Sequence, residues 1–81
     1  MTTSYTALIT GGSTGIGAEL CKHYIEAGYT VISLARTQLD WSHERLIQIS
    51  LDLLDEAATA KVAHEIAAQH NVTHFIHNAG V

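Results

Sequence analysis

The 81-residue chain contains no proline and a single cysteine, Cys21. A lone cysteine excludes an internal disulfide, and the first residues lack the charged, apolar and small-residue succession of a secretory signal. No linker, internal repeat or low-complexity segment interrupts the chain. These absences predict a protein of the reducing cytoplasm, in which Cys21 is a small apolar filler of a helix's buried side rather than a reactive thiol.

Basic residues are also scarce. Four Lys plus Arg stand against eight Asp plus Glu, which gives a formal net charge of -4. That balance leaves no basic stripe for DNA or RNA. No apolar run approaches the roughly 20 residues that cross a bilayer, and neither end carries a lipidation motif. We therefore expect a soluble protein with neither a nucleic-acid nor a membrane partner.

Apolar residues, in contrast, make up 47% of the chain and charged residues only 15%. This composition favours an ordered globular fold and argues against disorder. At this length a folded chain buries only about 60% of its extended surface, so the core is thin. The chain is expected to form one domain, residues 1–81.

Turn residues divide the sequence into alternating strands and helices. The predicted strands cover residues 5–10, 29–35, 46–51 and 72–77. Helices are predicted from Ile16 to a left-handed closing Gly28 and from a capping Asp55 to about Gln69. The apolar face of the first helix contains Ile16, Leu20, Cys21, Tyr24 and Ile25, and that of the second contains Ala58, Val62 and Ile66. Strands that alternate with helices imply an α/β fold with a parallel sheet and right-handed crossovers.

One connection is shorter than this pattern requires. Residues 36–45 are ten in number, fewer than the roughly dozen of a parallel crossover that contains a full helix. We expect a loop or a single helical turn, with Leu39 and Trp41 covering the side of the sheet that a longer helix would cover. An exposed loop is the alternative.

Glycines are concentrated where the first predicted strand meets the first helix. Gly11, Gly15 and Gly17 leave the main chain bare, so that it can approach a pyrophosphate closely. The unpaired N–H groups and the positive dipole end of the following helix favour an anion at the same place. No Gly-Lys-Ser/Thr follows, which excludes a P-loop nucleotidase. The junction predicts a dinucleotide site, whereas a tight turn without a ligand is the alternative.

Three segments in order resemble the short-chain dehydrogenase/reductase family in its short, non-extended branch. Residues 10–17 match T-G-x-x-x-G-x-G, Asp52 follows a strand as the family's adenine-side aspartate does, and residues 77–80 are similar to its N-N-A-G segment, with His77 in place of the first Asn. The resemblance implies a Rossmann-like doubly wound parallel sheet of strand order 3-2-1-4, here its N-terminal half. It also implies that the ligand lies across the carboxyl ends of strands one and four.

The resemblance implies a coenzyme site as well. The expected phosphate contacts are Gly11, Ser13, Thr14, Gly15, Ile16 and Gly17, the adenine contacts are Asp52 and Leu53, and the contacts beside the adenosine ribose are Asn78, Ala79 and Gly80. Thr10 is expected to brace the turn, and Asn78 to be more structural than chemical. Asp52 has a second possible role as a cap of the following helix.

Arg36 is the most informative single side chain for predicting which nicotinamide coenzyme is preferred. NAD-preferring sites place a carboxylate at the end of the second strand, where it repels a 2′-phosphate. Here Ala35 occupies that place and Arg36 follows it, and a guanidinium can grip a phosphate with two hydrogen bonds. In the family this arrangement accompanies NADPH. We therefore expect a preference for NADP(H), with NAD possible, and a solvated arginine is the alternative.

Six histidines raise the possibility of a metal site, but none is expected. His70, His74 and His77 are close in sequence, yet Asn71 breaks the helix after His70 and residues three apart on a strand point to opposite faces. A structural zinc site usually also requires thiolates or a closed set of four ligands.

The family's reaction moves a hydride between the coenzyme and a small-molecule carbonyl or alcohol, using Ser, Tyr and Lys. None of Tyr5, Tyr24 and Tyr29 is followed four residues later by lysine, so no catalytic residue is assigned. A strand with Phe75 and Ile76 would also be left as an exposed edge. We expect the N-terminal, coenzyme-binding part of a longer oxidoreductase, a homo-oligomer as the family usually is. The alternative is a non-catalytic dinucleotide-sensing or scaffold protein.

Overall fold

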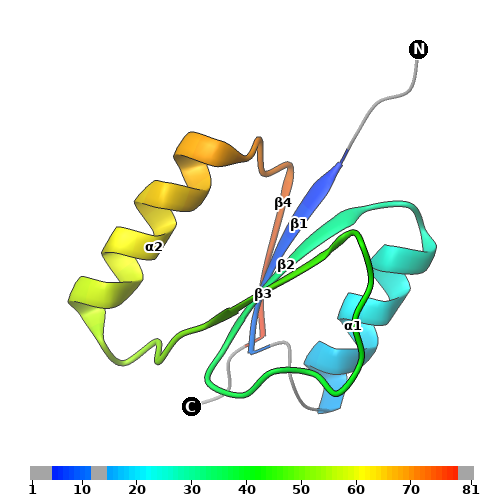
Figure 1. The fold of residues 1–81 in the computed structure, drawn as a ribbon, viewed down its shortest axis with the longest axis horizontal. Coiled ribbons are helices and arrows are strands. Elements are labelled where there is room, and N and C mark those ends of the chain that lie inside the picture. Colours follow the sequence, from blue (N-terminus) through cyan, green and yellow to red (C-terminus); the bar gives the residue numbers. More distant parts are fainter. Residues whose placement is uncertain (1–4, 12–14, 79–81) are drawn as a thin grey trace.

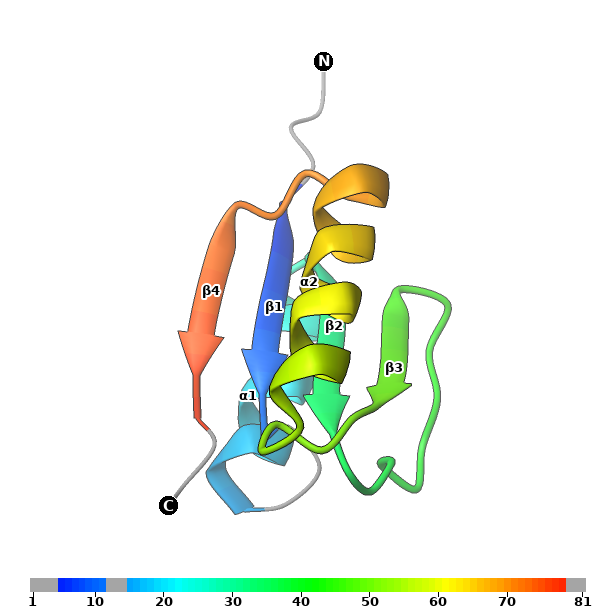
Figure 2. The ribbon, with the colours of Figure 1, turned by 90° about the vertical axis from the view of Figure 1, so that its left-hand side faces the viewer.

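The computed structural model describes residues 5–11 and 15–78. Within them the elements are β1 (Thr6–Thr10), α1 (Gly15–Glu26), β2 (Thr30–Ala35), β3 (Leu46–Ser50), α2 (Glu56–Gln69) and β4 (His74–His77). The strands form one sheet of order β3-β2-β1-β4, and every neighbouring pair is parallel. Figure 2 shows the four strands side by side, pointing the same way. The predicted fold class and strand order are confirmed, with element ends shifted by one or two residues.

The two helices cover opposite faces of the sheet, as Figure 1 shows with the sheet seen edge-on. Alternation along the strands sends apolar side chains to both faces, because successive residues point in opposite directions. On the α1 face the core consists of Ala7, Ile9, Cys21, Ile25 and Val31. On the α2 face it consists of Leu8, Ile32, Leu34, Leu51 and Ile66. The two central strands, β1 and β2, are buried on both faces, which explains why they read as nearly continuous apolar runs.

Helix α1 packs by the stripe Gly17, Cys21 and Ile25, all of them buried. Leu20 and Tyr24 are partly buried against the same core, as predicted. The expectation for Ile16 was wrong, because 73% of this residue is exposed. It lies in the first turn, at the end of the row that continues through Leu20 and Tyr24, and is not among the side chains packed on the core.

Gly28 ends α1 as the sequence predicts. Its φ is 94°, a left-handed backbone conformation that residues other than glycine rarely adopt. The N–H of Gly28 donates to the carbonyl of Ile25 at 3.0 Å, and that of Tyr29 donates to the carbonyl of Tyr24 at 2.9 Å. This is the Schellman pattern, which satisfies the last carbonyls of the helix and turns the chain into β2.

Residues 36–45, all within the described part, form a loop without a helix. Leu39 and Trp41 pack on the α1-face core, which confirms the predicted covering role. The amide of Gln48, on β3, accepts a hydrogen bond from the N–H of Leu39 at 2.6 Å and donates to the carbonyl of Trp41 at 3.4 Å. A polar side chain of the neighbouring strand therefore replaces part of the bonding that a crossover helix would supply.

Helix α2 begins after Asp55, whose carboxylate accepts a hydrogen bond from the N–H of Ala58 at 3.1 Å. This confirms the predicted cap. Ile66 is buried, and Ala58 and Val62 pack beside it, as the periodicity indicates. Neither α1 nor α2, the helices of the described residues, has the length and apolar character needed to cross a bilayer.

Candidate functional site

The predicted site residues gather at one edge of the sheet, where the four parallel strands end. Gly11 follows β1, Arg36 follows β2, Asp52 and Leu53 follow β3 closely, and Asn78 follows β4. Helix α1 also begins at this carboxyl edge, at the bottom of Figures 1 and 2. Parallel topology thus brings together residues that lie far apart in sequence. Ser13, Thr14, Ala79 and Gly80, also predicted site residues, lie outside the described residues.

The described glycines of the turn have the freedom that a phosphate site needs. Gly11 has φ 67° and Gly15 has φ 52°, both left-handed. A Cβ added at Gly15 would meet no atom within 4 Å, so the space in front of it is open. The N–H of Gly11 donates to the carbonyl of Leu34 at 2.8 Å, which fixes the start of the turn to β2. Gly17 is buried in the stripe that faces the sheet, and its small size allows close packing of α1 there.

Thr10 braces the turn, as predicted. Its hydroxyl accepts a hydrogen bond from the N–H of Asn78 at 3.1 Å and lies 3.0 Å from Nδ1 of His77. The N–H of Asn78 also donates to the carbonyl of Thr10 at 3.2 Å, and Nδ2 of Asn78 donates to the carbonyl of Gly11 at 3.3 Å. Asn78 therefore has the structural role predicted for it, joining the end of β4 to the end of β1.

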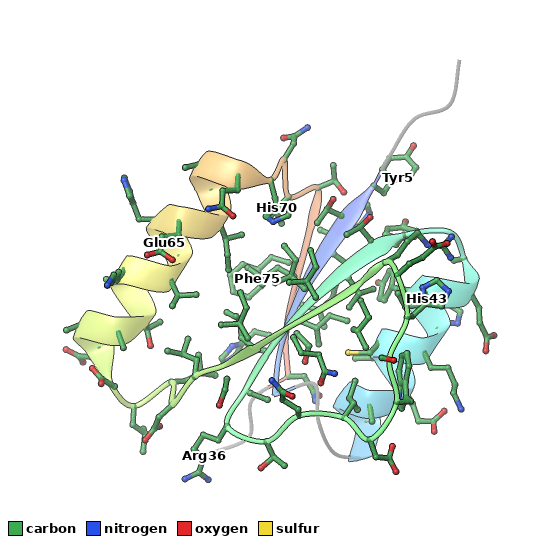
Figure 3. The ribbon with its side chains drawn as sticks, in the orientation of Figure 1. Tyr5, Arg36, His43, Glu65, His70 and Phe75 are labelled. Atoms are coloured by element: carbon green, nitrogen blue, oxygen red, sulfur yellow. The ribbon has the colours of Figure 1, made fainter. Side chains whose placement is uncertain are left out.

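Arg36 is exposed at the carboxyl edge, directly after the buried Ala35. Figure 3 shows its side chain extending away from the ribbon into solvent. The main-chain carbonyl of Arg36 accepts a hydrogen bond from the hydroxyl of Ser50 at 3.1 Å. The guanidinium is thus exposed to solvent, on a main chain whose carbonyl is held by Ser50.

Asp52 and Leu53 form the turn between β3 and α2. One carboxylate oxygen of the exposed Asp52 accepts a hydrogen bond from the N–H of Leu54 at 3.0 Å, and its carbonyl accepts one from the N–H of Asp55 at 2.9 Å. Asp52 therefore shapes the turn, whereas Asp55 caps the helix. Leu53 packs partly on the α2-face core, which holds this turn against the sheet.

The three neighbouring histidines occupy separate environments. His70 caps the end of α2, and His77 contacts Thr10. His74 packs among the rings of Tyr5, Tyr24 and Tyr29, with ring centroids 5.1 to 6.4 Å away. No three His, Cys, Asp or Glu of the described residues gather so that they could hold a metal ion.

Cys21 is fully buried in the α1-face core, which confirms its predicted role as an apolar filler. Burial raises the pKa of the thiol above its ordinary value, and a hydrogen bond with Ser33 offsets part of that rise. A buried thiol that stays protonated is a poor nucleophile.

The tyrosines lie at the opposite edge of the sheet, where the strands begin. Tyr5 stacks on Tyr29 with centroids 5.4 Å apart, and Tyr24 meets Tyr29 edge-on at 4.8 Å. Figure 3 shows Tyr5 and Arg36 at opposite ends of the molecule. None of these phenols is placed to act on a ligand at the carboxyl edge.

Sequence reasoning missed Ser50. Its signal was weak, because a polar residue at the end of a strand is common. Its contact with Arg36 follows only once β2 and β3 are known to be neighbours that end together.

The chain is similar to known proteins over a range that includes the residues of the carboxyl edge. Residues 5–81 match the family model for short chain dehydrogenases. The acetoacetyl-CoA reductase of an Acinetobacter strain is 32% identical over an alignment of 87 residues, which covers 93% of this chain and 35% of that protein. A probable NADP-dependent dehydrogenase of Haemophilus influenzae is 35% identical over 83 residues, covering 94% and 33%.

Solved structures agree in fold. A short chain dehydrogenase from Leptospira borgpetersenii with bound NAD+ superposes with a TM-score of 0.89 at 27% identity, over 96% of this chain and 32% of that one. A member from Francisella tularensis gives 0.88 at 29% identity, over 98% and 32%. The chain thus spans about a third of the length of these relatives.

Proposed function

Because the chain belongs to the short-chain dehydrogenase family, we propose that it forms the coenzyme-binding part of an oxidoreductase that prefers NADP(H). The coenzyme lies along the carboxyl edge of the sheet. The whole protein transfers a hydride to or from a small carbonyl or alcohol compound, works in the cytoplasm, and assembles with copies of itself. The residues for hydride transfer come from a part of that protein outside these 81 residues.

The observation that carries the coenzyme preference is the exposed Arg36 next to a buried alanine. Ala35 is 8% exposed and has no group that could bind a ribose hydroxyl or repel a phosphate. A guanidinium in that position offers two parallel hydrogen bonds to the 2′-phosphate. The relative from Haemophilus influenzae carries NADP in its name, which agrees with this preference.

The remaining proposed contacts come from the segments that follow β1, β3 and β4 at the carboxyl edge. The pyrophosphate lies at the turn of Gly11, Ser13, Thr14, Gly15, Ile16 and Gly17, before the amino end of α1. The adenine lies near Asp52, whose exposed carboxylate can accept its amino group, and near Leu53. Asn78, Ala79 and Gly80 flank the adenosine ribose.

The test is a calorimetric titration of NADPH and of NADH into the protein and into its Arg36→Ala variant. Loss of a charge-assisted phosphate contact should weaken NADPH binding by about 1.5 to 3 kcal/mol. NADH has no 2′-phosphate, so its affinity should stay nearly unchanged.

Lys61→Ala is the matched control, since Lys61 is an exposed cation on α2 rather than at the edge. It removes the same net charge and should leave the ratio of the two affinities as it is. Equal losses for both coenzymes in the Arg36→Ala variant would refute the role of Arg36. An absence of binding heat with either coenzyme would refute the proposed function itself.

The second candidate function is a non-catalytic dinucleotide-sensing or scaffold protein on the same fold, which binds the coenzyme without turnover. Consumption of NADPH with a panel of small aldehydes and ketones, followed at its nicotinamide absorbance, decides between them. Turnover with any member of the panel supports the reductase.

A further inference from the structure

We propose that Ser50 is a positioning residue for the 2′-phosphate of the coenzyme. Its hydroxyl holds the main chain that carries Arg36, so that coenzyme selectivity depends on a residue of the neighbouring strand. The inference rests on the proposed function and deepens it.

The pairing of β2 with β3 shows why this hydroxyl matters. The ladder ends with Ala35 opposite Ser50, and the N–H of Leu51 donates to the carbonyl of Ala35 at 3.0 Å. Arg36 is the first residue beyond β2. The hydroxyl of Ser50 donates to the carbonyl of Arg36 at 3.1 Å and so extends the connection between the two chain segments by one residue.

The hydrogen bond from Ser50 restricts the main chain of Arg36, which is otherwise exposed to solvent. A long side chain at the end of a strand has many rotamers, and binding must restrict them along with the main chain beneath. When the hydroxyl of Ser50 already fixes the carbonyl of Arg36, less ordering remains for the moment of phosphate binding. The consequence is affinity for the coenzyme that carries the 2′-phosphate, whereas the other coenzyme gains nothing.

A second role for Ser50, direct contact with the phosphate, competes with the first. A hydroxyl has a single proton to donate, and here the carbonyl of Arg36 accepts it. A phosphate that lacks protons needs donors, so Ser50 cannot serve both acceptors at once. The two roles therefore predict different behaviour when Arg36 is removed.

The experiment is a double-mutant cycle of Ser50→Ala and Arg36→Ala, with NADPH and NADH affinities measured by calorimetry on each protein. Ser50→Ala should weaken NADPH binding about three- to tenfold, the effect of losing one hydrogen bond, and leave NADH unchanged. In the Arg36→Ala background the same change should have no effect on NADPH, because Ser50 acts through Arg36.

Two further variants complete the test. Ser50→Thr keeps the hydroxyl and should restore the NADPH affinity, whereas Ser42→Ala removes an exposed hydroxyl from the loop of residues 36–45 and should change nothing. Thermal unfolding of each variant shows that it is folded. An anchoring role predicts that NADPH affinity follows the presence of the hydroxyl at residue 50 and not the size of the side chain.

The proposal is overturned if Ser50→Ala weakens both coenzymes equally, or has no effect on NADPH. It is also overturned if the loss persists in the Arg36→Ala background, since that result assigns Ser50 a direct contact with the phosphate. Failure of the proposed coenzyme preference is recognised separately, by an Arg36→Ala variant that does not discriminate between NADPH and NADH.

Discussion

At the scale of single residues, the site depends on hydroxyls that hold other groups. Thr10 is 4% exposed, and its hydroxyl connects the end of β1 to both His77 and Asn78. Those contacts span 67 and 68 positions of sequence, so one oxygen atom joins two distant segments at the base of the glycine turn. Thr10 is buried, and its hydroxyl holds these two segments together.

Replacement of Thr10 by valine tests this role. Thr10→Val preserves the shape of the side chain but removes the acceptor for the N–H of Asn78, which keeps only its longer bond to the carbonyl of Thr10. The free energy of unfolding should fall by about 0.5 to 1.5 kcal/mol, measured by urea denaturation. Thr30→Val, at the start of β2, is the control and should be nearly neutral. Equal effects of the two changes would contradict the bracing role.

At the scale of elements, the carboxyl end of α1 is stabilised both by the local sequence and by a residue distant in sequence. The Schellman turn at Gly28 is encoded locally. The same carboxyl end is also held by Arg45, whose guanidinium donates to the carbonyl of Ile25 at 2.7 Å and to that of Tyr29 at 3.3 Å. A cation is favourable there because the carboxyl end of a helix is the negative end of its dipole.

Gly28→Ala tests the local part. A Cβ at this position would meet no atom within 4 Å, so the cost is conformational rather than steric contact with a neighbour. The left-handed φ should make the variant less stable by about 1 to 2 kcal/mol in urea denaturation. Gly28→Asn should lose less, because asparagine tolerates this region better. A stabilised alanine variant would show that the turn relaxes to a conformation open to all residues.

The sequence predicts these elements well because their signals are periodic and local. The two helices and four strands of the described residues, the cap at Asp55 and the lack of a full helix in residues 36–45 follow from spacing, turn residues and length. The contacts of Arg45 and Ser50 do not, since each depends on which segments the sheet brings side by side. Ile16 was misjudged for a related reason: a helical row indicates which side chains align but not where the packed core ends.

At the scale of the whole molecule, the two edges of the sheet have different compositions. The amino edge is closed by the packed rings of Tyr5, Tyr24, Tyr29 and His74. At the carboxyl edge lie the glycine turn, Arg36 and the exposed Asp52. Packed aromatic rings thus lie where the strands begin, whereas the exposed charges of Arg36 and Asp52 lie where the strands end.

The buried thiol makes stability depend on pH above neutrality. Burial raises the pKa of Cys21, so the unfolded thiol ionises at a lower pH than the folded one. The contribution is therefore complete below the ordinary thiol pKa and is lost as the pH rises from there through the raised value. The free energy of unfolding, followed by Trp41 fluorescence in urea between pH 7 and 10, should decline on this alkaline side. Cys21→Ala should lower stability at every pH but decline less steeply, and parallel curves for the two proteins would contradict the assignment.

β1 has a place in the sheet that bears on how the protein is made. Its partner β2 follows closely along the chain, but its other partner, β4, comes last among the described strands. During synthesis on the ribosome, β1 can pair with β2 early, whereas its second side stays open until Phe75 has left the exit tunnel. For that interval β1, with its apolar residues Ala7, Leu8 and Ile9, is an unprotected edge of the kind that chaperones shield.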